Sequence, residues 1–312
     1  MNKDFLSSVS GLRDDYPNET LAVAVSGGAD SMALLHWLKD VGAKIVALTV
    51  DHKLRPESAD EAEYVAKICK KLGVPHRILE WTGQKPKTGI EEAARAARYE
   101  LMLDYCKKNN IGVLATAHQA DDQIETFLMN LGRGSGIYGL AGMRGRQERD
   151  GVVIFRPLLG TSRAELQKYC DDNGIRHFND AMNDDERYLR VRIRKNRAKL
   201  GISDERILLA IENMSRAREY IESEARKLAR KIPVEIDADL LLNAAEEIRF
   251  RALSLMLGEE GHPLRLEKIK NAFAKMDAGD AKFTLAGFNV RKQNGKIRIW
   301  KEGTKWKNQR RR

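Results

Sequence analysis

The chain has 312 residues, of which 42% are hydrophobic and 32% are charged, and its net charge is +10. This length allows two or three domains with apolar cores, and no apolar run approaches the roughly 18 residues of a membrane span. The amino-terminal residues mix both charges and lack the apolar centre of a signal peptide. Cys69, Cys106 and Cys170 lie far apart, which argues against disulfides and cysteine-built metal sites. We therefore expect a cytoplasmic protein that has no membrane partner.

Strand and helix patterns alternate over the first 160 residues. Strands are predicted at 21–25, 44–51, 75–81, 111–117 and 152–156. Between them, capping boxes at Ser58–Glu61 and Ser162–Glu165 open two helices, and residues 88–108 form a third. The alternation predicts an α/β fold, a doubly wound and mainly parallel sheet with helices on both faces. Ligands of such sheets lie beyond the carboxyl ends of the strands.

The pattern changes after residue 200. Helices are predicted at 203–231, 243–257 and 265–277. Asn294-Gly295 lies between alternating residues and predicts a β-hairpin. We therefore expect a first domain at 1–205 and a smaller, mostly helical domain at 206–312 that ends in a basic hairpin and tail.

The positive charge is concentrated in two runs. Residues 291–312 hold ten Lys/Arg and one acid, and residues 187–199 hold seven basic residues and no acid, so the remainder carries about −6. A polyanion such as nucleic acid is the natural partner of such runs. The alternative is a solvated helix face and a disordered tail.

The segment Ser26-Gly27-Gly28-Ala29-Asp30-Ser31 joins the first strand to a helical pattern. It matches neither the Walker loop, which needs a lysine, nor the dinucleotide fingerprint. Two glycines let backbone amides close on an oxyanion, and the helix N-terminus adds positive charge. Asp30 would repel a bare phosphate, so we expect it to hold a divalent cation or to organise the loop. The alternative is a tight turn without a ligand.

This loop resembles the PP-loop of N-type ATP pyrophosphatases. The resemblance continues in VDHKLRPESADEAEYV (50–65), EEAARAARYELM (91–102), ATAHQADDQIETFLMNLGRGSG (115–136), RPLL (156–159) and DAMNDDERYLRVRIR (180–194). In this order the blocks resemble the compact form of the tRNA(Ile)-lysidine synthetase family. Val191 departs from the family pattern, which usually has asparagine there, and this puts one contact in doubt.

The resemblance implies a ligase that uses ATP and Mg²⁺. ATP would adenylylate O2 of the wobble cytidine in an isoleucine tRNA with a CAU anticodon, releasing pyrophosphate. The ε-amine of free L-lysine would then attack C2, giving lysidine and AMP. Residues 1–205 would be the PP-loop catalytic domain, and residues 206–312 would bind tRNA. The oligomeric state stays open, a homodimer being one alternative.

Candidate site residues follow from the blocks and the basic runs. The resemblance implies that ATP contacts Ser26, Gly27, Gly28, Ala29, Asp30, Ser31 and His52. It implies catalytic roles for Asp30, Arg95, Arg98, His118 and Asp122. Lysine is expected at Asp122 and Glu125, and Mg²⁺ at Asp30 and Asp121. The candidates for tRNA contact are Arg190, Arg192, Arg194, Lys195, Arg298 and Lys301.

Each of these assignments has a purely structural alternative. Arg95 and Arg98 lie three residues apart and could be ordinary surface charge on one helix face. Asp122 and Glu125 share the same spacing, and acids in a first turn favour the helix dipole. His52 and His118 each follow a strand and could be satisfied strand-end side chains. The sequence does not say which group takes the proton from the lysine amine.

Two other functions stay open. A tRNA thiolase of the same loop class would carry paired cysteines for sulfur chemistry, and the three cysteines here are unpaired in sequence. A non-catalytic nucleic-acid-binding protein with a vestigial nucleotide fold would turn over no ATP. Asp30, Ser31, Asp122 and Glu125 together speak against that second alternative.

Overall fold

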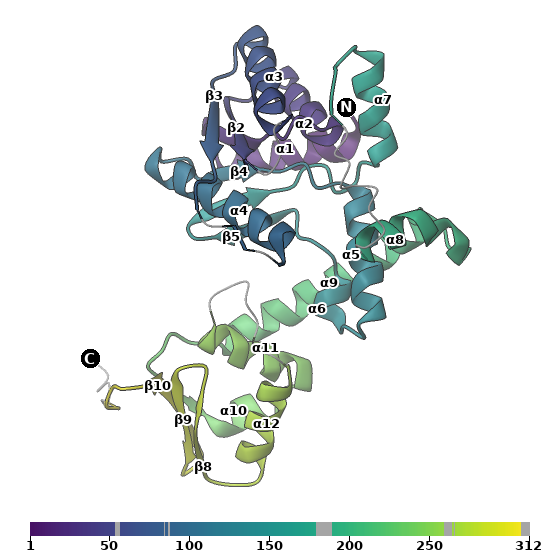
Figure 1. Cartoon of the computed structure of the whole chain (residues 1–312). Coiled ribbons are helices and arrows are strands. Elements are labelled where there is room, and N and C mark those ends of the chain that lie inside the picture. The colour runs from purple at the N-terminus through teal and green to yellow at the C-terminus, as the bar shows by residue number, and fades with distance from the viewer. Residues whose placement is uncertain are drawn as a thin grey trace. The chain divides into compact units, whose positions relative to one another are not determined.

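The computed structural model describes residues 1–312 except 54–56, 84, 87, 179–188, 259–263, 265 and 307–312. The chain divides into two units, Met1–Glu212 and Asn213–Arg312, and Figure 1 shows the elements of each. Parts of the 187–199 run and of the basic tail lie outside the described residues. The domain boundary at 205/206 stays a prediction.

The first unit is built on a six-stranded sheet in the order β3-β2-β1-β4-β6-β5. The strands are β1 (Leu21–Ala24), β2 (Ile45–Asp51), β3 (His76–Glu80), β4 (Val113–Ala115), β5 (Arg146–Arg149) and β6 (Val152–Phe155). All neighbours pair in parallel except β5, which runs antiparallel to β6 at one edge. The predicted fold class, a mainly parallel α/β sheet, is confirmed.

Helices cover both faces of this sheet. They are α1 (Lys3–Asp15), α2 (Ala29–Asp40), α3 (Glu57–Leu72), α4 (Ile90–Lys108), α5 (Ala120–Gly132), α6 (Ile137–Leu140), α7 (Arg163–Asp172) and α8 (Leu189–Asn196), followed by the 3₁₀ helix η2 (Arg197–Leu200). One core cluster joins the sheet to α1, α2, α3 and α7, and the other joins it to α4. Because both faces are covered, the central strands β1 and β4 are apolar throughout.

Two helix starts test the sequence patterns. Ser162 and Glu165 form the predicted capping box of α7, each side chain bonding the other's backbone amide. The box predicted at Ser58 is wrong, because α3 already begins at Glu57 and the Ser58 hydroxyl donates instead to Asp51 Oδ1 at 2.7 Å. This hydroxyl therefore ties α3 to the end of β2.

The second unit combines helices with an antiparallel sheet. Its elements are the end of α9 (Asp204–Leu228), then β7 (Val234–Asp237), α10 (Ala238–Leu242), α11 (Glu246–Leu257), α12 (Leu266–Asp277), β8 (Ala281–Leu285), β9 (Phe288–Gln293) and β10 (Lys296–Lys301). The sheet order is β7-β10-β9-β8. Asn294 and Gly295 both have positive φ, so the predicted hairpin turn is confirmed. The hairpin is the centre of a four-stranded sheet, which is more strand than the sequence predicts.

Candidate active site

The phosphate loop follows the carboxyl end of β1, at the point where the strand order reverses between β1 and β4. Gly28 is the N-cap residue of α2, so the first amides of that helix point at the loop. Ser31 holds the loop together, because its hydroxyl donates to the Gly28 carbonyl at 2.9 Å and accepts from the Ser26 amide at 3.1 Å. The two serine hydroxyls lie 3.2 Å apart. This geometry leaves amide donors for an oxyanion.

Gly27 is the constrained position of the loop. Its φ is +88°, a conformation that favours glycine. A side-chain Cβ at this position would lie 3.1 Å from Cδ2 of Phe178, and the Phe178 amide donates to the Gly27 carbonyl at 3.0 Å. Phe178 in turn packs edge-on against Tyr64 of α3. The loop is therefore held from outside by a residue 151 positions later in the chain.

Two arginines of α4 contact two strand-end histidines. Arg95 donates to Nε2 of His118 at 3.4 Å, and Arg98 donates to Nε2 of His52 at 3.3 Å. Because a guanidinium can only donate, Nε2 of His118 is the acceptor and its Nδ1 carries the proton. That Nδ1 lies 2.9 Å from the Thr116 hydroxyl, which accepts from it. The structure thus brings four predicted site residues together at the carboxyl edge of the sheet.

Both histidines are neutral at ordinary pH. Burial, together with the charges of Arg156 and Arg95, lowers the pKa of His118 to about 3. Burial and the charge of Arg98 lower the pKa of His52 to about 4. A histidine with such a pKa is a weak proton acceptor, so His118 suits hydrogen bonding and orientation better than proton removal.

Asp30 lies in the first turn of α2 beside the acids of α5. Burial and the negative charge of Asp122 raise the pKa of Asp30 to about 6, although Arg163 opposes this rise. The Arg163 guanidinium lies 3.9 Å from the Asp30 carboxylate. A carboxylate that other acids destabilise, next to a phosphate loop, is a suitable ligand for a divalent cation.

The predicted lysine ligands lie on one face of α5, as their spacing predicts, but arginines of α8 contact them. Glu125 is fully buried and lies 2.7 Å from the guanidinium groups of both Arg190 and Arg194. Asp122 lies 3.5 Å from Arg190 and also accepts from the Gln119 amide in a capping box. The two arginines therefore neutralise the negative charge of Glu125, whereas Asp122 has only one arginine beside it, at a longer distance. The lysine-binding roles stay predictions.

Asp121, the second residue assigned to Mg²⁺, already has both oxygens occupied. Its Oδ2 accepts from the Arg163 amide at 2.8 Å, and its Oδ1 accepts from the Arg197 guanidinium. Burial would raise its pKa, but these two donors outweigh burial and hold the pKa below its usual value. Within the described ranges, no cluster of three His, Cys, Asp or Glu side chains is arranged for a metal ion.

A magnesium ion still fits the site through Asp30. In enzymes that act on nucleotides, Mg²⁺ usually takes one or two carboxylates together with substrate phosphates. The partly exposed Asp30 carboxyl, with its raised pKa and its position beside the loop amides, matches that donor set. Asp121, the other residue assigned to Mg²⁺, is less suited to this role because it is hydrogen-bonded at both oxygens.

The six basic residues assigned to tRNA contact lie on α8 of the first unit and β10 of the second. Arg192 and Lys195 are exposed on α8, whereas Arg190 and Arg194 face the acids of α5. In the second unit Arg298 pairs with Glu235 at 2.6 Å, and Lys301 is exposed at the end of β10. Val191, the departure from the family pattern, is buried at 5% exposure.

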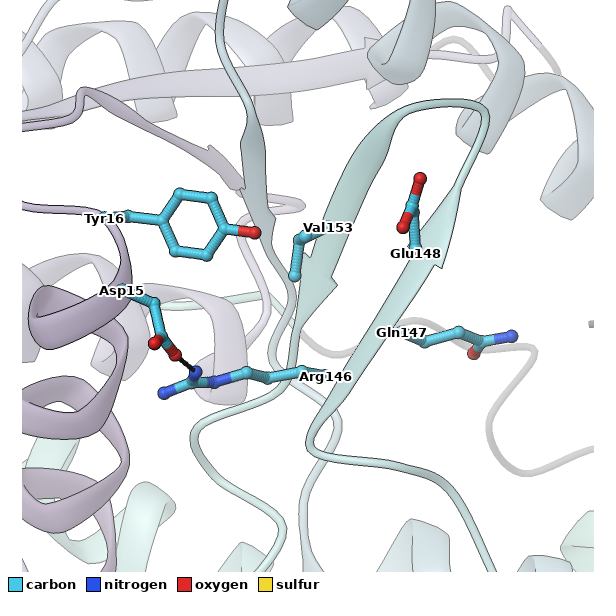
Figure 2. A pocket seen from close by; sticks show the side chains of 6 residues that line it. All are labelled: Asp15, Tyr16, Arg146, Gln147, Glu148 and Val153. Atoms are coloured by element: carbon cyan, nitrogen blue, oxygen red, sulfur yellow. Dashed lines mark hydrogen bonds and ion pairs between the residues drawn. The ribbon is translucent and has the colours of Figure 1, made fainter. Parts of the chain in front are cut away.

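A pocket of about 420 Å³ lies elsewhere in the first unit. Figure 2 shows its lining, Asp15, Tyr16, Arg146, Gln147, Glu148 and Val153, with the ion pair between Arg146 and Asp15. Tyr16 precedes β1 and Val153 is near the start of β6, so the pocket lies at the amino ends of the strands. The phosphate loop follows the carboxyl end of β1, and the pocket is therefore not part of the candidate active site.

Known proteins match most of this chain. The PP-loop domain family matches residues 1–200. The tRNA(Ile)-lysidine synthase of Ruegeria pomeroyi is 38% identical over 98% of this chain and 76% of its own length. That of Methylobacterium nodulans is 35% identical over 89% of each. The chain belongs to the tRNA(Ile)-lysidine synthase family. The U34-tRNA thiolase of Methanococcus maripaludis, at 15% identity, a TM-score of 0.55 and coverage of 70% of this chain and 79% of its own, shares the fold alone.

Several residues join the site of this family member without being singled out by the sequence patterns. Arg156, in the RPLL block, is buried and lowers the pKa of His118. Arg163 contacts both Asp30 and Asp121, and Phe178 contacts Gly27. Gln119 caps α5. Arg156 and Gln119 could have been found from their blocks, whereas the roles of Arg163 and Phe178 depend on tertiary contacts.

Proposed function

We propose that this chain joins lysine to C2 of the wobble cytidine in an isoleucine tRNA with a CAU anticodon. ATP is split into AMP and pyrophosphate by way of an adenylylated cytidine. Membership of the tRNA(Ile)-lysidine synthase family supports the reaction. The observation that carries the proposal is the glycine loop before α2, with Arg95, His118 and Asp122 around it.

None of the helices in the described ranges is long and apolar enough to cross a membrane.

In the first half-reaction the cytidine O2 attacks the α-phosphorus of ATP, and pyrophosphate leaves. The amides at Gly27 and Gly28 and the N-terminus of α2 stabilise the charge that develops on the phosphates. Mg²⁺, held by Asp30 when bound, would neutralise the charge of the leaving pyrophosphate. Arg95 and Arg98 are positioned by His118 and His52, and their guanidinium forks suit phosphate oxygens.

In the second half-reaction the lysine ε-amine attacks C2, and AMP leaves with the electrons of the C2–O2 bond. The ammonium group of lysine would bind Asp122, whose carboxylate is 15% exposed and only weakly paired. The amine must lose its proton before or during attack. His118, with a pKa of about 3, is poorly suited to accept that proton, so we assign it to orienting the cytidine or Arg95.

The test is to mix the protein with ATP, Mg²⁺, labelled lysine and a transcript of an isoleucine tRNA with a CAU anticodon. ATP-dependent transfer of the label to RNA, together with AMP, is the expected result. Incorporation of labelled sulfur instead would indicate the thiolase, and tRNA binding without AMP would indicate the non-catalytic protein. The matched RNA control carries uridine in place of the wobble cytidine and should accept no lysine.

A further inference from the structure

The four-stranded sheet of the second unit has one covered face and one open face. Val290, Ile297 and Ile299 are buried against α11 and α12 in one core cluster. Figure 1 shows helices α10 and α12 on one side of strands β8 to β10. Side chains alternate along a strand, so the residues between these apolar ones point to the opposite face. Arg291 and Lys282 are exposed there.

The strand register places charged residues in one line across this open face. Glu235, Arg298, Arg291 and Lys282 are directly opposite one another on β7, β10, β9 and β8. Arg298 pairs with Glu235 at 2.6 Å. Among the residues that the structure describes, neither Arg291 nor Lys282 makes an ion pair. We call Arg298, Arg291 and Lys282 the cationic row.

The neighbouring line on the same face is different. Asp237, Lys296 and Gln293 are opposite one another, and Lys296 pairs with Asp237 at 3.1 Å. The two acids in these lines, Glu235 and Asp237, therefore lie on β7, and each forms an ion pair with a cation of β10. The uncompensated charge is left on β9 and β8, at Arg291 and Lys282.

Such an arrangement is costly for the protein alone. Like charges directly opposite each other in a sheet are destabilising, whereas opposite charges stabilise by roughly 0.2–1 kcal/mol per pair. An acid at either position would have removed the repulsion. The repulsion is relieved when an anion binds across the row, and an extended polyanion can meet several of its members at once.

Aromatic side chains support one member of the cationic row, Arg298. Arg298 lies over the ring of Trp306 at 5.8 Å, and Trp306 packs edge-on against Trp300 at 5.7 Å. The Trp300 indole donates to the Thr304 carbonyl at 3.2 Å. Cations fixed on paired strands lose less conformational entropy on binding than cations on a free tail.

We propose that Arg291 and Lys282, with Arg298 beside them, bind the phosphate backbone of the tRNA away from the reacting cytidine. The proposal rests on the proposed function, because that function makes tRNA the substrate. The charge of the second unit agrees with it, since residues 213–290 are neutral and residues 291–312 carry +9. Phosphate contacts position an RNA without reading its sequence.

The experiment compares two double variants of the full chain. Lys282→Gln with Arg291→Gln removes two charges from the cationic row. The control, Lys268→Gln with Lys270→Gln, leaves Arg291 and Lys282 intact. It removes two exposed charges of α12, the helix whose apolar side covers the other face of the sheet. The tRNA affinity of each protein is measured against salt concentration. Thermal unfolding of each variant confirms that it is folded.

We expect the salt slope of the row variant to fall by roughly 1.4–1.8, since each lost phosphate contact accounts for about 0.7–0.9. The α12 variant should keep the wild-type slope. The KM for tRNA should rise in the row variant, while kcat at saturating tRNA and the KM for lysine should not change. This split separates a phosphate contact from damage to the catalytic unit.

Three results would overturn the proposal. The first is a row variant with the wild-type salt slope, and the second is an equal loss in both variants. The third is unchanged tRNA binding with reduced binding to phosphatidylserine vesicles, which would assign the row to a membrane surface. Failure of the wild-type chain to make lysidine would refute the proposed function instead, and the binding measurement would still test the row.

Discussion

Gly27 shows how one residue can fix the conformation of the phosphate loop. Its positive φ excludes most side chains, and the Phe178 ring occupies the space that a side chain would need. The Phe178 amide also donates to the Gly27 carbonyl. The loop therefore depends on a residue that no local pattern connects to it.

The first prediction concerns this contact. Gly27→Ala should lower the rate of pyrophosphate release by roughly 10²-fold, the cost of losing one preorganised oxyanion donor. Gly42→Ala is the matched control, because Gly42 also has positive φ but a Cβ there meets nothing within 4 Å. A folded Gly27→Ala protein with normal pyrophosphate release would remove the loop from the mechanism.

The second prediction separates the half-reactions. Asp122→Asn should raise the KM for lysine roughly ten- to a hundredfold, because a charge-assisted hydrogen bond contributes about 1.5–3 kcal/mol. Adenylylation of the RNA should continue, since an asparagine can still accept from the Gln119 amide. The two steps are measured separately, with and without lysine. An unchanged lysine KM in a variant that cannot adenylylate would place Asp122 on ATP or the metal instead.

The third prediction concerns pH. The folded-state pKa values of His52 and His118, about 4 and about 3, lie below the usual value of 6.5. Between the folded-state pKa values and pH 6.5 the unfolded chain binds more protons than the folded chain. The contribution of the two histidines to the free energy of unfolding is therefore complete above pH 6.5 and is lost as pH falls. The urea midpoint should therefore drop between pH 7 and pH 5, and less steeply in a His52→Gln, His118→Gln double variant. Identical slopes for both proteins would contradict the lowered pKa values.

Parts of the site that lie within one motif could be predicted from the sequence, and contacts between motifs could not. The loop is local, because its glycines and the helix start follow directly from SGGADS. The contact of Arg95 with His118 depends on how α4 crosses the end of β4. The pairing of Glu125 with Arg190 joins residues 65 positions apart, and no spacing rule reaches that far.

At the level of elements, the sequence predicts those that bury a clear apolar pattern. The five parallel strands are confirmed within one or two residues at each end. Strand β5 was missed because Arg146–Arg149 reads RQER and is held by backbone bonds to β6 at an edge. Helix α1 was missed although Phe5, Val9 and Leu12 have helical spacing, because its remaining residues are mostly polar or glycine.

The fourth prediction concerns the sheet of the second unit. Lys282→Glu places an acid opposite Arg291, which should stabilise the fold by roughly 0.2–1 kcal/mol. The same change should weaken tRNA binding, because it adds a negative charge to the cationic row. Thermal unfolding and tRNA affinity are measured on one preparation. A variant that loses stability would show that Lys282 and Arg291 do not repel each other.

At the scale of the whole chain, the positive charge continues beyond the sheet. Residues 307–312 add Lys307 and three arginines and no acid. A truncation after Trp306 keeps all of β10 and the contact of Trp306 with Trp300. A truncation after Trp300 would also remove Lys301, the last residue of β10, and so would disturb the sheet.

The fifth prediction follows from this choice of cut. Deleting residues 307–312 should reduce the salt slope of tRNA binding by roughly 1.4–1.8 if two of the four cations touch phosphate. The KM for lysine should not change, because its proposed ligands belong to the first unit. The affinity of full and truncated chains is measured over a range of salt concentrations. Equal slopes would mean that the last six residues make no phosphate contact.

The long helix α9 gives the two units a common element. Ile207 and Ile211 pack with Ile124 in the first unit, and Ala225 belongs to the core of the second. The division after Glu212 thus falls inside a continuous helix of 25 residues. A helix propagates cooperatively, and each new end exposes four unpaired backbone groups. A recombination breakpoint at 212/213 would therefore keep each core cluster on its own product, but it would cut α9 and leave each product with a new helix end whose backbone groups are unpaired.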